Sequence, residues 1–348
     1  MKHIVANNKI KNILYALAGL GGISLVIIIH EMGHFLFAKL FGVPTPIFSL
    51  GFGPALFSLP IGDTLFQIAL LPFGGYVDMD PEALAAQPYL PKMLIVSAGI
   101  VFNLIFAYSI LLYYAIYHQG TPTPIIGSIT PNSPAEYAEL QVHDTIIQWN
   151  HEAIDDDIEF LLKKIAESAG KTITLTIKRN HTLHDVPIEL NLEHPLFGPH
   201  TGWLGIELQK KPIKQTSFFN TITTGHAHYT ETIRNLSKTM AGMMSQKDTH
   251  GTIIGPIGII SMMGKSLAIN PQLFWFIMAM VSLNIGLFNI LPLPFFDGGR
   301  ALIYTIEALT GITISPIILW YITIIFLALF IFFIAKVTMS DVKRLSRK

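Results

Sequence analysis

The sequence contains no cysteine and few charged residues. Of its 348 residues, 13% are charged and 51% are hydrophobic, whereas a typical soluble domain has about 25% charged residues. Without cysteine there are no disulfides or thiolate metal sites, so any metal must be held by His and carboxylate side chains. The formal net charge is zero, which argues against nucleic acid as a partner. The composition predicts a membrane protein.

Four stretches are long and apolar enough to cross a bilayer, which requires about 20 mostly apolar residues. They cover approximately residues 13–40, 93–117, 273–293 and 317–337. The first is not expected to be a cleaved signal peptide, because its apolar run ends in a His-rich motif instead of a small-residue cleavage site. The expected fold is therefore a polytopic α-helical membrane protein with about four transmembrane helices.

The first apolar stretch contains His30-Glu31-Met32-Gly33-His34, which reads His-Glu-x-x-His. Residues four apart on an α-helix point the same way, so both imidazoles can bind one Zn²⁺. Glu31 follows His30 directly and can act as the general base that this motif supplies in metalloproteases. The alternative is a chance pair of histidines, which is disfavoured because ionisable groups inside a membrane span are costly and usually functional.

A second motif follows the third apolar stretch, where Asn289 begins the run Asn-Ile-Leu-Pro-Leu-Pro-Phe-Phe-Asp-Gly-Gly. Its two prolines end a helix and force extended backbone before Asp297. A catalytic zinc site uses three protein ligands, and Asp297 is predicted to be the third. The alternative is that Asp297 caps a helix, in which case Asp78 or Asp80 becomes the next candidate ligand.

The region 42–91, between the first two apolar stretches, is rich in Gly and Pro yet too apolar for an ordinary exposed loop. Residues 47–50 and 64–70 are typical of short strands separated by glycines. Extended backbone at membrane depth requires protein or water to satisfy its polar groups. The region is predicted to be a re-entrant or interfacial β element beside the zinc helix, with a plain surface loop as the alternative.

Residues 121–212 differ from the rest in composition and predict a soluble α/β module. Residues 172–178 alternate strictly between polar and apolar, as in a half-buried strand. The segments 126–129, 133–140 and 144–147 resemble a PDZ domain, with Glu139 and His143 at positions where glycine is usual. PDZ domains bind extended peptides by strand addition; a structural spacer is the alternative. The chain thus divides into residues 1–120, 121–212 and 213–348, the last beginning with an interfacial helical region.

Taken together, the motifs resemble the site-2 protease family of intramembrane zinc metalloproteases. The nearest subgroup is the bacterial regulator-of-sigma-E protease type, which cleaves anti-sigma factors and remnant signal peptides. The resemblance covers nearly the whole chain, although many relatives carry two PDZ domains in tandem and this length permits one. It implies that His30, His34 and Asp297 bind zinc and that Glu31 is the general base.

The resemblance also implies roles in substrate binding. Asn289 would contact the substrate backbone, Gly51-Phe52-Gly53 matches a glycine-rich loop near the active site, and the following hairpin would pair with an unwound substrate. The segment 97–103 resembles the family's second-span motif, with Ile100 where Pro is common.

The implied location is the bacterial inner membrane, as a multi-pass protein with the PDZ-like module on the periplasmic side. Basic residues at both termini would, by the positive-inside rule, place the termini and the module in the cytoplasm instead. We follow the family resemblance on this point. A catalytically inactive scaffold and a metal or ion transporter are the alternative functions, since intramembrane His and Asp also serve ion passage.

Overall fold

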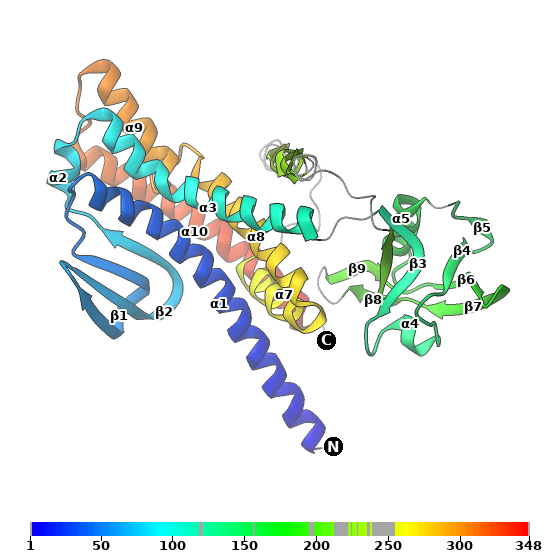
Figure 1. Ribbon diagram of the computed structural model, residues 1–348. Coiled ribbons are helices and arrows are strands. Elements are labelled where there is room, and N and C mark those ends of the chain that lie inside the picture. Colours follow the sequence, from blue (N-terminus) through cyan, green and yellow to red (C-terminus); the bar gives the residue numbers. More distant parts are fainter. Residues whose placement is uncertain are drawn as a thin grey trace. The chain divides into compact units, whose positions relative to one another are not determined.

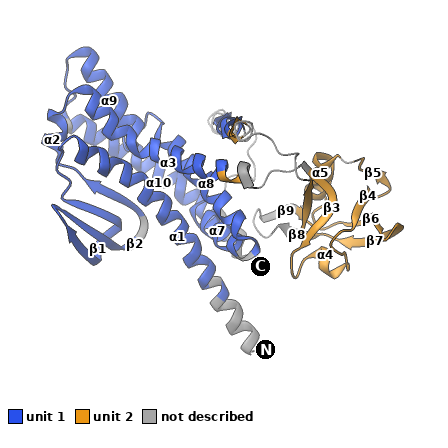
Figure 2. Cartoon of the chain, in the orientation of Figure 1, with its two compact units in different colours: residues 1–112, 226–343 blue, residues 113–225, 344–348 orange. Residues whose placement is uncertain are grey.

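The computed structural model describes residues 2–117, 121–155, 157–194, 198–211, 222–223, 225–227, 229–234, 237–238 and 255–346. The chain divides into two compact units (Figure 2). The first comprises residues 1–112 and 226–343, and the second comprises residues 113–225 with 344–348. In the predicted interfacial region after residue 212, residues 213–221, 224, 228, 235–236 and 239–254 lie outside the described residues.

The first unit is mainly helical (Figure 1). Its elements are α1 (Lys2–Leu40), β1 (Ile47–Ile61), β2 (Thr64–Asp78), α2 (Pro81–Ala86), α3 (Tyr89–Tyr117), α7 (Pro256–Ile269), α8 (Pro271–Asn289), α9 (Asp297–Thr310) and α10 (Pro316–Ser346). The helical stretches Ile13–Leu40, Tyr89–Tyr114, Pro271–Asn289 and Ile317–Met339 are long and apolar enough to cross a membrane. The predicted polytopic helical fold is therefore confirmed.

The region of the third stretch differs from the expectation in two ways. The third stretch ends at Asn289 instead of residue 293, because Pro292 and Pro294 cannot continue a helix. A separate helix, α7, precedes it and was not expected from the sequence. Pro256 stands in its first turn, where proline is favoured, and the side chain of Asn270 then caps α8 by accepting from Gln272 N at 2.8 Å.

The helices of this unit pack closely where glycine replaces a larger residue. A Cβ on Gly19 would collide with Ile260 O, and one on Gly264 with Tyr15 O, so α1 and α7 approach backbone to backbone. Val26 of α1, Met263 of α7 and residues of α8 then form a common buried cluster. This packing fixes α1, the helix that carries the His-Glu-x-x-His motif.

The region between α1 and α3 forms a β structure beside α1 (Figure 1). Residues 47–50 pair on one side with residues 65–68, and on the other side with residues 75–78 running in the opposite direction. Residues 57–61 pair in turn with residues 64–68. The two long strands therefore fold into four short segments, and residues 75–78 form an outer segment of the sheet.

The second unit is an α/β module. Its elements are β3 (Thr121–Ile129), α4 (Pro134–Tyr137), β4 (Thr145–Trp149), β5 (Glu152–Ala153), α5 (Ile158–Glu167), β6 (Thr172–Arg179), β7 (Thr182–Glu189), β8 (Asn191–His194), β9 (Gly198–Trp203) and β10 (Ile206–Lys211). The main sheet has the order β10-β3-β4-β6-β7, so β10 and β7 are its edges. Alternating residues of β6 enter a core around the fully buried Trp149. Asp157 caps α5 by accepting from Phe160 N.

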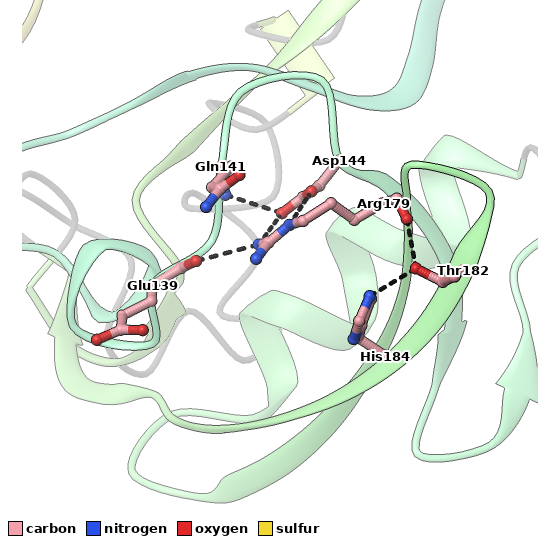
Figure 3. Close-up of polar contacts among 6 residues, drawn as sticks. All are labelled: Glu139, Gln141, Asp144, Arg179, Thr182 and His184. Atoms are coloured by element: carbon pink, nitrogen blue, oxygen red, sulfur yellow. Dashed lines mark hydrogen bonds and ion pairs between the residues drawn. The ribbon is translucent and has the colours of Figure 1, made fainter.

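A partly buried ion pair holds the turn before β4 (Figure 3). Arg179 donates to both carboxylate oxygens of Asp144, at 2.8 and 2.6 Å, and also to Glu139 O. Burial of the Asp144 carboxyl opposes its ionisation, but the hydrogen bonds from Arg179 outweigh burial and hold the pKa of Asp144 below its ordinary value. Glu139 and His143 adopt φ of 55° and 76°, so the left-handed turn that glycine usually serves is kept.

Candidate metal centre

His30 and His34 lie one helical turn apart on α1, and both side chains are buried. Their Nε2 atoms are 3.3 Å apart. His34 Nδ1 lies 2.8 Å from Ile95 O on α3. A carbonyl oxygen only accepts, so Nδ1 carries the hydrogen, and in the neutral ring Nε2 presents a lone pair.

Asp297 reaches the two histidines from the first turn of α9. Its Oδ2 lies 3.2 Å from His30 Nε2 and 3.3 Å from His34 Nε2. The approach depends on Gly298 and Gly299, because a Cβ at these positions would collide with Ile290 O and Leu293 O. The N-cap of α9 is Phe296, with no side-chain cap hydrogen bond. The structure thus gives no support to the alternative in which Asp297 serves as the helix cap.

These three atoms have the spacing of a tetrahedral zinc site. Atoms bound tetrahedrally at about 2.0–2.1 Å lie roughly 3.3–3.4 Å from one another, and the three separations here are 3.2, 3.3 and 3.3 Å. Asp297 Oδ2 is buried without a hydrogen-bond partner among the described residues. Electron-rich atoms that converge in this way are stabilised by a cation, and two imidazoles with one carboxylate are a donor set suited to zinc. The residues present therefore fit the metal.

Glu31 is half-buried beside this cluster and faces the outer strand of the β structure. A Cβ built on Gly75 would lie 3.5 Å from Glu31 Cγ and 3.1 Å from Ile27 Cγ2. The strand backbone at Gly75 therefore lies directly against α1 at the position of Glu31. Glu31 thus adjoins both His30 in the sequence and the extended backbone at Gly75.

The other predicted site residues lie in two places. Asn289 ends α8, and its amide donates to Ile285 O of the same helix at 3.0 Å. Gly51 and Gly53 both have φ near +90°, which permits the sharp bend in β1. Phe52 between them stacks on Tyr76 with ring centroids 6.1 Å apart.

Asp78 and Asp80, the alternative candidates for the third ligand, have other structural roles. Asp80 caps α2 by accepting from Ala83 N at 2.8 Å, and Asp78 ends β2 opposite Ile47. Within the described residues, the one group of three His or carboxylate side chains close enough to hold a metal is His30, His34 and Asp297.

Three residues of α3 complete the surroundings of the histidines, and their role was not predicted from the sequence. Ile95 O contacts His34, Asn103 Nδ2 lies 3.2 Å from His30 Nδ1, and a Cβ on Gly99 would collide with both imidazoles. Their spacing of four residues places them on one helical face. The one sequence signal that could have indicated this role is the presence of Gly99 and Asn103 in the segment that resembles the family's second-span motif.

Comparison with known proteins identifies the family of the chain. The sequence profile of peptidase family M50 matches residues 18–333. The chain belongs to peptidase family M50. This membership confirms the resemblance to the site-2 proteases and the prediction of a zinc metalloprotease.

Relatives of this M50 protein extend over nearly its whole length. A Nostoc protein, provisionally named a zinc metalloprotease, is 31% identical over 85% of this chain and 86% of its own. Similarly named proteins of Clostridium acetobutylicum and Campylobacter jejuni are 28% and 30% identical, covering 95% and 93% of this chain and 97% and 92% of their own lengths. A Listeria monocytogenes PDZ domain overlaps 26% of this chain and 90% of its own with 21% identity and a TM-score of 0.22, an overlap too limited to establish a shared fold.

Proposed function

We propose that this M50 zinc metalloprotease cleaves peptide bonds within or near the transmembrane segments of membrane proteins. The observation that carries the proposal is the convergence of Asp297 with His30 and His34 on α1, a helix apolar enough to span a membrane, where Glu31 lies beside them. In this proposal the first three residues hold zinc and Glu31 is the general base. Anti-sigma factors and remnant signal peptides are the expected kinds of substrate.

A bound zinc ion would supply Lewis-acid polarisation of the scissile carbonyl and lower the pKa of water. The chain's own contribution is the Glu31 carboxylate. It takes a proton from the attacking water and then passes it to the leaving amide nitrogen. Asn289, at the end of α8, would hold the substrate backbone in place during this transfer.

A transmembrane substrate must be unwound before it can be cut, because its peptide bonds lie inside its own helical hydrogen-bond ladder. We propose that the outer strand, residues 75–78, replaces those bonds by pairing with the unwound segment. This strand pairs on one side with residues 47–50, and Gly75 brings it against Glu31. The glycine-rich segment 51–53 would bend the sheet so that the strand reaches the site, as a re-entrant element within the membrane.

The inserted module would select substrates without taking part in the reaction. β10 is an edge strand of its sheet, and an edge strand can accept an extended peptide as an added strand. We place the protein in the bacterial inner membrane with this module on the periplasmic side, following the family resemblance.

The test replaces Glu31 by Gln and measures zinc content and cleavage of a transmembrane reporter. The protease proposal predicts wild-type zinc with no cleavage, because the amide cannot act as a base. Glu82→Gln, at an exposed position on α2, is the matched control and should keep both. An inactive scaffold would show no cleavage in the wild type, and a transporter would show ion flux in liposomes that does not depend on Glu31; either result would refute the proposal.

A further inference from the structure

Asn103 is fully buried where α1, α3 and α8 meet. Its side-chain nitrogen Nδ2 lies 3.2 Å from His30 Nδ1, and its backbone carbonyl accepts from Ser282 Oγ at 2.9 Å. Gly286 of α8 lies beside it, since a Cβ there would be 3.6 Å from Asn103 Cβ, an ordinary van der Waals contact. Asn103 thus contacts α1 through its side chain, at the proposed zinc ligand His30, and α8 through its backbone carbonyl.

The proposed zinc site determines which amide atom must face His30. For His30 to bind a cation through Nε2, that nitrogen must present a lone pair, so the hydrogen of the neutral ring must lie on Nδ1. A hydrogen on Nδ1 needs an acceptor, and the amide nitrogen of Asn103 is a donor only. Rotation of the amide by about 180° brings Oδ1 to this position and provides the acceptor.

Nothing else in the described part of the chain competes for this amide. Asn103 Oδ1 has no hydrogen-bond partner there, and the contact of Nδ2 is the one with His30. The amide orientation of Asn103 and the tautomer of His30 are therefore coupled: a hydrogen on His30 Nδ1 requires Asn103 Oδ1 to face it.

We propose that Asn103 is a positioning residue of the metal centre, whose side-chain oxygen accepts from His30 Nδ1 and so keeps Nε2 free for the metal. The inference rests on the zinc site proposed above. It gives α3 a paired role: Ile95 O accepts from His34 Nδ1, Asn103 Oδ1 accepts from His30 Nδ1, and Gly99 between them leaves space for the rings. Partners of this kind fix ring orientation, and their loss costs about 10- to 100-fold in metal affinity.

The test measures the zinc dissociation constant of the full chain in detergent by competition with a chromogenic chelator. Asn103→Leu keeps the approximate size and removes the acceptor, so its dissociation constant should rise by about 10- to 100-fold. Asn103→Asp keeps an acceptor oxygen and removes the donor, so it should bind zinc within about threefold of the wild type, because a carboxylate is a common partner of a metal-bound histidine. Asn284→Leu is the matched control: Asn284 lies in α8, donates to Met280 O of its own helix, and should leave zinc affinity unchanged.

The melting temperature of each metal-free variant separates positioning from packing. Reduced zinc affinity in Asn103→Leu with an unchanged metal-free melting temperature supports the inference, and wild-type zinc affinity in that variant overturns it. If Asn103→Leu fails to fold, Asn103→Asp decides: retained zinc supports the acceptor role, and loss of zinc from a folded Asn103→Asp protein refutes it. Zinc binding that survives in both His30→Ala and His34→Ala would instead overturn the proposed site itself, and this inference with it.

Discussion

Replacing Gly99 by Ala should damage the metal centre although it replaces none of the proposed ligands. The added methyl would lie 2.7 and 2.8 Å from His30 Cε1 and Nε2, and closer still to His34 Nε2. Ordinary contact begins at 3.4 Å, so the rings must move by at least 0.6–0.7 Å. Displacements of roughly 1 Å in a catalytic arrangement cost about 100-fold in rate. We therefore expect cleavage to fall by about that factor and zinc affinity to fall with it.

The assay compares zinc content and the initial rate of cleavage of a transmembrane reporter by purified protein in detergent. Gly21→Ala is the matched control on α1, since a Cβ there meets nothing within 4 Å. It should leave zinc content and cleavage unchanged. Wild-type zinc affinity and cleavage in Gly99→Ala would show that the two imidazoles do not occupy the described positions and would refute the reasoning.

Three further predictions concern the ligand, the module and its ion pair. Asp297→Asn should fold but bind zinc far more weakly, since a neutral amide is a poor ligand for a dication, whereas Asn289→Ala should keep zinc and lose turnover; equal zinc contents in the two variants would contradict these roles. Deletion of residues 121–211 should leave zinc content unchanged and broaden the range of reporters cut, and a deletion variant that binds zinc but cuts no reporter would contradict a purely selective module. Because the folded-state pKa of Asp144 is lowered, its pair with Arg179 stabilises the module fully above the unfolded value of about 3.9 and loses that contribution as pH falls through the folded pKa. Hydrogen exchange of β4 and β6, corrected for intrinsic pH dependence, should show protection that falls at acid pH in the wild type but not in Asp144→Asn. The same fall in protection in Asp144→Asn as in the wild type would contradict this role of the ion pair.

Much of the fold follows from local pattern. The strict alternation of residues 172–178 predicts β6, because this signal depends only on neighbours in the sequence. The spacing of His30 and His34 likewise requires only a helix. The helix α7 was missed because its 14 residues are too few to cross a bilayer, so it was not among the predicted apolar stretches.

The surroundings of the candidate site could not be predicted in the same way. Asn103 lies 73 residues from His30 in the chain, and nothing in its own segment indicates which histidine nitrogen it faces. The role of Gly99 could not be predicted from its neighbours either, because it depends on the close approach of α3 to α1 in the tertiary structure. Asp297 was predicted from the need for a third ligand and from its Pro- and Gly-rich setting, and its contact with both histidines depends on the packing of α9.

The most direct test of the central claim is zinc X-ray absorption spectroscopy of the purified full-length protein. The account predicts about one zinc per chain, with two imidazole nitrogens and carboxylate or water oxygens at about 2.0–2.1 Å. In His30→Ala combined with His34→Ala, both the imidazole signature and the stoichiometric zinc should be lost. A wild-type spectrum without imidazole ligands, or stoichiometric zinc that survives the double replacement, would contradict the assignment of this site.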